Sequence, residues 1–341
     1  MSGKYQVITD KLELELKKMR SEGKTKLPPE QELAGRFSCS RQTVRASLDI
    51  LRDKGLIVKK KGSGSYLADE RKCGKTVFFM TEDCDRYESH ALISGLRDRL
   101  GRFGYKLKCF SSGGSVSGAK DILLQVMEDL PSALIIEPSS DLIPDPNLKL
   151  IEKINELGIP AVYCNSSLGS VHVAPDSFEG GRILTRYLNG AGRKRIACIF
   201  RMDDSSGLDC FRGYMEALPD SAFDESGCFL ITRKEETDII SGRDKKLEDM
   251  ADKIRSGFDA VICGNGMIAH RLVQIFGKNA RSASGDTAVA CFDNCGAFAD
   301  DDGIITSGYD NDLLCRSLAS AAVSLAEGRS AKSVTVPAKQ I

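Results

Sequence analysis

The six residues from position 40 to 45 read Ser-Arg-Gln-Thr-Val-Arg, and their side chains could bind nucleic acid. Arginine and glutamine donate hydrogen bonds to base edges and phosphates in the major groove of DNA. Ser40 is a good N-cap, because its hydroxyl can accept from the unpaired N–H groups of a first helical turn. A helix that begins here would present Arg41, Gln42, Thr43 and Arg45 at its N-terminal end, where recognition helices contact DNA.

The spacing of apolar residues predicts the elements that would position these side chains. Val44, Leu48 and Leu51 recur every three or four residues, as does the buried stripe of an amphipathic helix. A shorter helix is expected at residues 30–37, after two prolines. Residues 56–67 predict a β-hairpin with a glycine turn and a basic arm. This order of helix, turn, helix and basic hairpin is typical of a winged helix-turn-helix that reads DNA.

The same stretch resembles the winged-helix domain of GntR-type bacterial transcription regulators. The matching residues are Leu27-Pro28, Glu30, Glu32-Leu33-Ala34, Ser40-Arg41, Thr43-Val44-Arg45 and Gly62-Ser63-Gly64. Pro29 departs from the pattern, because the family usually has there the serine that caps the second helix. DNA contacts are expected from Lys4, Tyr5 (for which packing is the alternative), Glu30, Arg36, Ser40, Arg41, Gln42, Thr43, Arg45, Lys59, Lys60, Lys61, Gly62, Ser63 and Gly64.

Charge is distributed unevenly along the chain. The formal net charge is zero, yet residues 1–72 hold 17 Lys or Arg against 10 Asp or Glu, and the remainder holds 31 against 38. A basic end on an acidic body fits local attraction to nucleic acid, although a solvated lysine face would have the same charge.

Several classes of protein are disfavoured by what the sequence lacks. We see no apolar core after a basic start, and no run of about eighteen apolar residues, so no signal peptide and no membrane span are expected. The twelve cysteines are scattered without a Cys-x-x-Cys pair. We therefore expect a cytoplasmic protein with reduced thiols that serve as small apolar residues, with no metal and no cofactor.

From Thr76 onward, strand and helix patterns alternate, which predicts an α/β body of two doubly wound parallel sheets. The expected boundaries are 1–68 for the winged helix, 69–75 for a linker and 76–341 for the body. Lobe one would hold about 76–174 and 310–328, and lobe two about 175–309 and 329–341. Predicted strands lie at 77–80, 106–110, 133–136, 161–163, 196–200, 228–231, 260–263, 288–291 and near 334–336; predicted helices lie at 90–103, 119–130, 148–157, 179–188, 208–218, 247–255, 268–276 and 313–326.

Five runs in this body look like the effector domain of LacI/GalR regulators, a fold shared with periplasmic sugar-binding proteins. They are residues 134–138, 158–162, 176–181, 212–218 and 292–293. A GntR-type head on such a body is similar to the arabinose-responsive repressors. The resemblance implies a small effector, such as a sugar, held in a cleft between two lobes.

Residue by residue, the resemblance implies effector contacts from Asn265, Asp293, Tyr309 and Asn165, each at or near the end of a strand. Strand-end caps are the alternative for Asn265 and Asp293. The family usually has an arginine three residues before Gly213, where this chain has Cys210. Because a strong donor is missing there, an atypical effector is expected. Further predicted contacts are Asp83, Tyr87, His90, Glu137 and Asp176, for some of which a solvated loop is the alternative.

The sequence therefore predicts a transcription repressor that binds operator DNA as a homodimer and is controlled by a small molecule, a sugar or sugar derivative. No phosphate-binding loop and no Gly-x-Ser-x-Gly elbow is found, so no enzyme activity is expected. Three alternatives stay open: a repressor whose body is an effector-blind dimerisation scaffold, a sugar-binding protein and a cytosolic enzyme.

Overall fold

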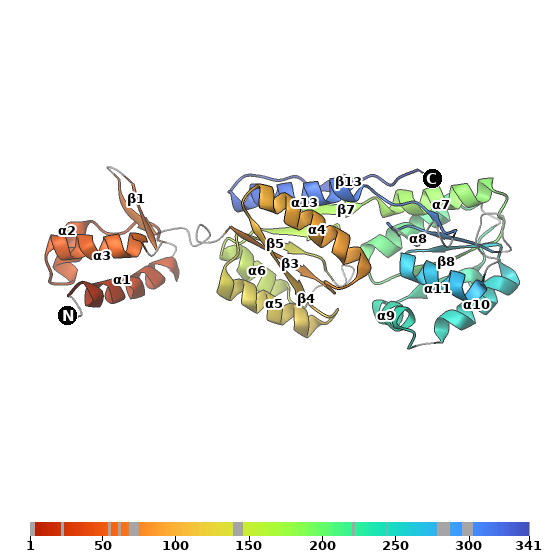
Figure 1. The fold of residues 1–341 in the computed structure, drawn as a ribbon, viewed down its shortest axis with the longest axis horizontal. Helices are drawn as coiled ribbons and strands as arrows, with labels where there is room; N and C mark the ends of the chain where they lie inside the picture. Colours follow the sequence, from red (N-terminus) through yellow and green to blue (C-terminus); the bar gives the residue numbers. More distant parts are fainter. Residues whose placement is uncertain are drawn as a thin grey trace. The chain divides into compact units, whose positions relative to one another are not determined.

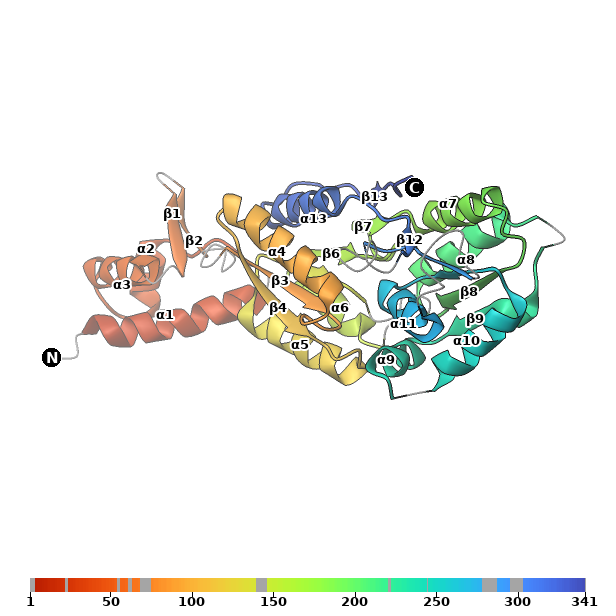
Figure 2. The ribbon, with the colours of Figure 1, turned by 45° about the vertical axis from the view of Figure 1, so that its right-hand side comes forward.

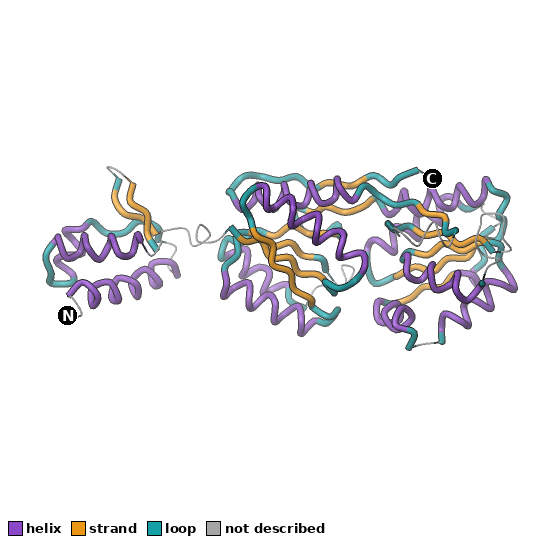
Figure 3. Tube along the Cα trace, in the orientation of Figure 1, coloured by secondary structure: helices purple, strands orange, loops and turns teal. Residues whose placement is uncertain are grey.

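The computed structural model describes residues 4–21, 24–53, 56–60, 63–67, 75–138, 146–219, 222–243, 245–277, 287–294 and 303–340. They form two compact units, Met1–Lys75 and Thr76–Ile341, each with its own apolar core (Figures 1 and 3). Within the described residues, no helix is long and apolar enough to cross a membrane.

The first unit is the predicted winged helix-turn-helix. Its helices are α1 (Lys4–Ser21), α2 (Glu30–Arg36) and α3 (Arg41–Asp53), and its hairpin is β1 (Ile57–Lys60) with β2 (Gly64–Leu67). The apolar stripe predicted for α3 is fully buried and packs on the stripe of α1, because three- and four-residue spacing aligns side chains along one helix face. Leu12, Leu33, Val44, Leu48, Leu51 and Ile57 form the centre of this core.

The second unit begins with a parallel sheet of six strands in the order β13-β7-β6-β5-β3-β4. Helices α4 and α13 cover one face of this sheet, and α5 and α6 cover the other (Figure 2). Burial on both faces explains why its strands read as nearly continuous apolar runs. The elements are β3 (Thr76–Thr81), α4 (Tyr87–Arg102), β4 (Lys106–Ser111), α5 (Val116–Asp129), β5 (Ala133–Ile136), α6 (Leu148–Glu156), β6 (Ala161–Cys164), β7 (His172–Pro175), α13 (Asn311–Ala326) and β13 (Val334–Val336).

A second parallel sheet has the order β12-β11-β10-β8-β9 and makes a second lobe. Helices α7 and α8 pack on one face, and α9, α10 and α11 pack on the other. The elements are α7 (Ser177–Gly190), β8 (Ile196–Arg201), α8 (Ser205–Ala217), the 3-10 turn η2 (Glu225–Gly227), β9 (Cys228–Ile231), α9 (Arg233–Ser241), α10 (Lys246–Gly257), β10 (Ala260–Cys263), α11 (Gly266–Phe276), β11 (Ala288–Cys291) and β12 (Ile305–Thr306).

The chain passes between the lobes three times: after β7, after β12 and after β13. The three crossings lie side by side, since Asp176 N–H donates to Val336 at 2.8 Å and Tyr309 pairs with Ala338. The predicted placement of 329–341 in lobe two is therefore wrong for β13, which pairs with β7 in the first sheet. Only the residues after β13 return to lobe two, where Lys339 bonds with Ser307 and Gly308.

Helices α7 and α8 pack closely because each has a glycine at the contact. A Cβ at Gly181 would lie 2.2 Å from the carbonyl oxygen of Cys210, and one at Gly213 would lie 2.0 Å from that of Phe178. Any side chain there would force the helices apart. This contact holds the α8 segment that carries Cys210 against the second sheet.

Four elements of the body were not predicted: β7, the 3-10 turn η2, α9 and the two-residue strand β12. The omission of α9 matters most, because it begins at Arg233 in the cleft. Its start has a recognisable signal, since Thr232 accepts from Glu235 N–H and the Glu235 carboxylate accepts from Thr232 N–H. This reciprocal capping box appears in the sequence as Thr-x-x-Glu.

Candidate functional site

Helix α3 presents polar side chains on the face opposite its buried stripe. Ser40 Oγ accepts from Thr43 N–H at 3.1 Å, which caps the first turn as the sequence predicts. Arg41 and Gln42 are exposed directly after this cap. The N-terminal end of α3 therefore combines free donors with the positive end of a helix dipole, a favourable surface for phosphate and base edges.

Two predicted DNA-binding arginines are held by carboxylates of the same unit. Arg45 lies 3.1 Å from Glu30, and its side chain remains 67% exposed. The hydrogen bond with Glu30 raises the pKa of Arg45, so the residue stays charged. Arg36 pairs with Glu15 at 2.8 Å and so ties α2 to α1.

The wing is a two-stranded antiparallel hairpin in which Lys60 lies opposite Gly64. Gly64 has a φ of +111°, a conformation that suits glycine. Lys59 is drawn to α3 by Asp49 at 3.0 Å, and Ser63 Oγ bonds Tyr66 Oη at 2.6 Å. Two predicted residues of the wing tip, Lys61 and Gly62, lie outside the described residues, as do the side chains of Lys4, Tyr5 and Lys60.

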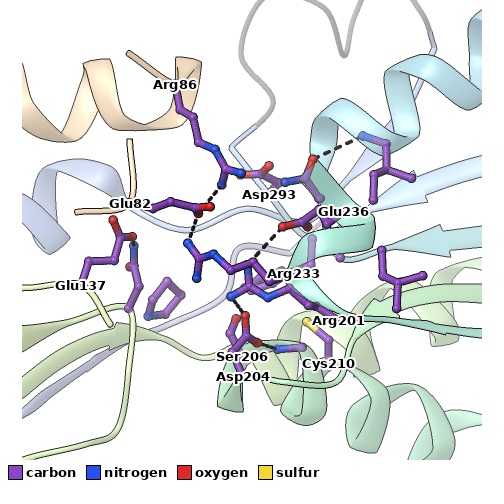
Figure 4. Close-up of a pocket in the computed structure, with 18 of the residues that line it drawn as sticks. Glu82, Arg86, Glu137, Arg201, Asp204, Ser206, Cys210, Arg233, Glu236 and Asp293 are labelled. Carbon is purple, nitrogen blue, oxygen red and sulfur yellow. Dashed lines mark hydrogen bonds and ion pairs between the residues drawn. The ribbon is translucent and has the colours of Figure 1, made fainter. Parts of the chain in front are cut away.

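A cavity of about 200 Å³ opens between the lobes of the second unit, at the carboxyl ends of both sheets (Figure 4). Its described lining is rich in charge and amide groups, with few apolar side chains. The polar lining residues are Thr81, Glu82, Arg86, Glu137, Asn165, Arg201, Asp204, Ser206, Arg233, Glu236, Asn265, Asp293 and Tyr309.

Arg201 ends strand β8 and is the centre of an acidic cluster in lobe two. Its guanidinium lies 3.1 Å from Glu236 and also pairs with Asp204 (Figure 4). It lies 3.4 Å from Asp203 as well. The Glu236 side chain is only 6% exposed. Burial makes this pairing necessary, because an isolated carboxylate in such a place would lose its hydration without compensation.

Arg233 makes an ion pair that spans the cleft. It starts α9 in lobe two and pairs with Glu82, which follows β3 in lobe one; both side chains are 12% exposed. Glu82 also accepts from Arg86 at 2.9 Å, so two guanidinium groups share one carboxylate. Burial lowers the pKa of Arg233 to about 10, which still leaves it charged at neutral pH.

Glu137 and Asn165 form a second polar group on the lobe-one wall. Asn165 Nδ2 donates to Glu137 at 2.7 Å, and Thr81 Oγ1 donates to the other carboxylate oxygen. Asn165 has a φ of +53°, which turns the chain sharply at the end of β6. Its buried Oδ1 has no hydrogen-bond partner within the described part of the chain. Such an atom is a ready acceptor for a ligand donor.

Asn265 and Asp293 line the cavity and also cap backbone groups. Asn265 Oδ1 accepts from Met267 N–H at 2.8 Å, which starts α11, and Asp293 accepts from Gly266 N–H at 2.9 Å. A capping role and a ligand contact are thus compatible for Asn265, because its capping bonds use the side-chain oxygen and leave the amide N–H groups to other partners.

Cys210 and Tyr309 complete the predicted residues that line the cavity. Cys210 is buried, and burial raises the pKa of its thiol far above the usual range. It therefore contributes a small neutral surface where a guanidinium was expected. The Tyr309 ring packs 6.2 Å from that of Phe292, between centroids.

Other predicted effector residues lie elsewhere. Asp83 accepts from Asp85 N–H at 2.9 Å in a local turn, and Asp176 accepts from Glu179 N–H at 3.0 Å as the N-cap of α7. His90 is exposed on α4. None of these three is among the described lining residues, because each side chain serves its own turn or faces solvent. The side chain of Tyr87 lies outside the described residues.

The predicted set lacks Glu82 and Arg86 of lobe one, and it lacks four charged residues that lobe two brings to the cavity, Arg201, Asp204, Arg233 and Glu236. Each of these four lies at the end of a strand or the start of a helix on the carboxyl edge of the second sheet. That position is a general signal for ligand contact in open α/β sheets. A search for polar residues at the carboxyl end of every predicted strand, rather than for family motifs, would have found Arg201.

The chain combines a winged helix-turn-helix with a two-lobed α/β unit that has a polar interlobe cavity. This combination defines a class, the DNA-binding transcription regulators with a two-lobed effector domain. The family comparison agrees, since residues 4–67 match the model described as "Bacterial regulatory proteins, gntR family". The N-terminal unit is a GntR-type DNA-binding domain.

Known proteins resemble larger parts of the chain. The chain is 28% identical over 276 residues to the arabinose metabolism transcriptional repressor of Geobacillus stearothermophilus, covering 79% of this chain and 76% of that protein. The body has the LacI/periplasmic-binding-protein fold. It superposes on a LacI-type regulator of Alkaliphilus metalliredigens complexed with D-xylulofuranose, with a TM-score of 0.64, 13% identity and coverage of 79% and 97%. It also superposes on the myo-inositol binding protein of Caulobacter, with a TM-score of 0.64, 18% identity and coverage of 78% of this chain and 93% of that one.

Proposed function

We propose that this protein represses transcription as a homodimer and that a neutral polyhydroxylated molecule, a sugar, releases it from DNA. The observation that carries the proposal is the polar cavity between the lobes, in a chain whose other unit is a GntR-type DNA-binding domain. Two symmetric heads would match two half-sites of an operator. Arg41, Gln42, Thr43 and Arg45 would contact bases and phosphates.

The charge of the cavity supports a neutral ligand over an anionic one. Its described lining holds five carboxylates, Glu82, Glu137, Asp204, Glu236 and Asp293, against three guanidinium groups. A sugar acid or sugar phosphate would meet an excess of like charge. A hydroxylated ring instead offers donors to carboxylates and to the open Asn165 Oδ1, and acceptors to arginines.

The relatives favour the same class. The Geobacillus relative is named for arabinose metabolism, and the two solved structures hold D-xylulofuranose and myo-inositol, all neutral polyols. Which polyol this chain binds depends on Cys210, which leaves room and no donor at its position.

Regulation would follow from linkage between the cleft and the heads. A ligand that contacts both walls stabilises the closed arrangement of the lobes and biases the dimer toward a head spacing that does not fit the operator. The required coupling is modest, since about 1–3 kcal/mol changes DNA affinity roughly 5- to 150-fold.

The test combines ligand screening with DNA binding. Purified protein is screened by thermal shift against L-arabinose, D-xylose, D-ribose and myo-inositol, together with the corresponding sugar acids and phosphates. We expect a neutral polyol to raise the melting temperature and to release a DNA duplex selected from a random pool. Glu137→Ala should abolish the shift, and Glu156→Ala, on the exposed end of α6, should retain it.

Two outcomes would refute the proposal. If DNA binds and no polyol stabilises the protein, the body is an effector-blind scaffold. If no duplex binds at low salt, where phosphate attraction is strongest, the regulator function itself fails.

A further inference from the structure

Lobe two contains two thiols that face each other across neighbouring strands. Cys198 on β8 and Cys228 on β9 are register partners, and their sulfur atoms lie 3.6 Å apart. Neighbouring strands are about 4.8 Å apart, within the range of roughly 4.4–6.8 Å that disulfides span between Cα atoms. The backbone therefore already has the spacing of a disulfide, and only the side chains need to rotate.

The two thiols differ in accessibility. Cys198 is fully buried, whereas Cys228 begins the edge strand of the sheet and is partly exposed. Cys198 Sγ donates to Cys228 Sγ, which lowers the pKa of Cys228, while burial raises the pKa of Cys198. Cys228 is thus the thiol that a soluble oxidant reaches, and the one whose thiolate is favoured.

We propose that Cys198 and Cys228 are a peroxide-sensitive thiol pair that closes to an intramolecular disulfide. The Cys228 thiolate attacks one oxygen of hydrogen peroxide, which breaks the O–O bond, forms a sulfenic acid and releases hydroxide. Cys198 then attacks the Cys228 sulfur and expels the hydroxyl group as water. In total, two thiols are oxidised to one disulfide and one peroxide is reduced to two waters.

Oxidation at this pair would be transmitted to the cleft, an effect that rests on the proposed function. Strand β8 continues from Cys198 to Arg201, and β9 ends two residues before Arg233. The same two strands therefore deliver both lobe-two guanidinium groups to the cavity. A disulfide would covalently link the two strands three residues before Arg201, restrict their motion relative to each other and so constrain the acidic cluster around Arg201.

The first experiment detects the disulfide without reference to ligand or DNA. The full chain is exposed to hydrogen peroxide, blocked with N-ethylmaleimide, digested with trypsin without reduction and analysed by mass spectrometry. Residues 196–201 and 213–233 are tryptic peptides that each hold a single cysteine. We expect these two peptides to appear joined after oxidation, and separate again after treatment with dithiothreitol.

The same sheet offers a matched control. Cys263 and Cys291 are also register partners on neighbouring parallel strands, but both are fully buried. If exposure of one thiol decides reactivity, this pair stays reduced at peroxide concentrations that oxidise Cys198 and Cys228. Cys228→Ser, at the partly exposed position, should abolish the joined peptide, and Cys198→Ala should leave Cys228 as a trapped sulfenic acid.

Separate peptides after oxidation, or equal oxidation of the buried pair, would overturn the assignment. The functional consequence is measured on the polyol that gives a thermal shift in the reduced protein. We expect oxidation to change that shift in the wild type and not in Cys228→Ser. If the two peptides are joined but no polyol shifts the melting temperature of the reduced protein, the assignment of the thiol pair stands and only the proposed function is refuted.

Discussion

The predicted DNA-binding surface of α3 and the interlobe cleft hold similar charged residues in opposite ways. On α3, Arg41 and Arg45 lie at the surface, and the Arg45 pair with Glu30 is largely hydrated. In the cleft, the side chains of Arg201 and Arg233 are only 18% and 12% exposed, and each is matched by carboxylates. Exposed charges contribute little to folding and remain free to bind a partner, whereas buried charges must be satisfied within the fold first.

The comparison is tested most severely by Arg201→Met. Three carboxylates would lose their shared counter-charge in a buried place, and we expect the free energy of unfolding of the second unit to fall by about 3–5 kcal/mol. Arg195→Met is the matched control, because its pair with Asp224 is exposed, and it should cost less than about 1 kcal/mol. Urea unfolding measures both. Equal losses would show that burial does not distinguish the two pairs.

Glu82→Gln is expected to have the next largest effect. It would leave Arg86 and Arg233, one from each lobe, facing each other without a carboxylate between them. We expect a loss of about 2–4 kcal/mol and an opening of the cleft. Small-angle X-ray scattering would detect the opening as a larger radius of gyration. A variant with the compactness and stability of the wild type would show that this ion pair does not hold the lobes.

Arg45→Ala should separate binding from folding. We expect operator affinity to weaken by about 1–3 kcal/mol if Arg45 contacts a base, while the free energy of unfolding changes by less than about 1 kcal/mol. Fluorescence anisotropy with the selected duplex gives the affinity. Arg52→Ala, in the last turn of the same helix, is the control. An unchanged affinity for Arg45→Ala would remove that residue from the interface.

The smallest effect is expected at the start of α9. A hydrogen bond from Lys246, aided by Thr232 N–H, lowers the pKa of Glu235 to about 2. The ionised carboxylate therefore stabilises the fold above the ordinary pKa of glutamate, and the stabilisation is lost as the pH falls toward 2. Glu235→Ala should cost about 0.5–1 kcal/mol at pH 7 and progressively less in acid. A pH-independent difference would contradict this origin.

Much of the fold follows from local patterns. Val44, Leu48 and Leu51 identify α3, and Ser40 identifies its first turn, because helix periodicity and capping act within a few residues. The same holds for most strands of the body, whose apolar runs reflect burial on both faces. The helix α9 was missed because its capping box is followed by charged residues rather than by an obvious apolar stripe.

The cleft was predicted less completely, since its contacts join distant parts of the chain. Nothing near Glu82 in the sequence indicates that its partner is Arg233 in the other lobe. Family resemblance directed attention to Cys210 and the arginine missing there, while the guanidinium groups of lobe two enter from β8 and α9. Asp83 and Asp176 were assigned to the ligand because motifs cannot distinguish a capping carboxylate from a binding one.

The three side-by-side crossings between the lobes limit how the body can move. A single connection would permit the lobes to twist and slide relative to each other. Three adjacent connections that are hydrogen-bonded to each other resist such shear, so a hinge rotation is the motion that remains. Opening should therefore proceed as rotation about one axis close to Asp176, Tyr309 and Ala338. Small changes in the φ and ψ angles of these connecting residues would become large displacements at the far ends of the lobes, because displacement grows with distance from the hinge axis.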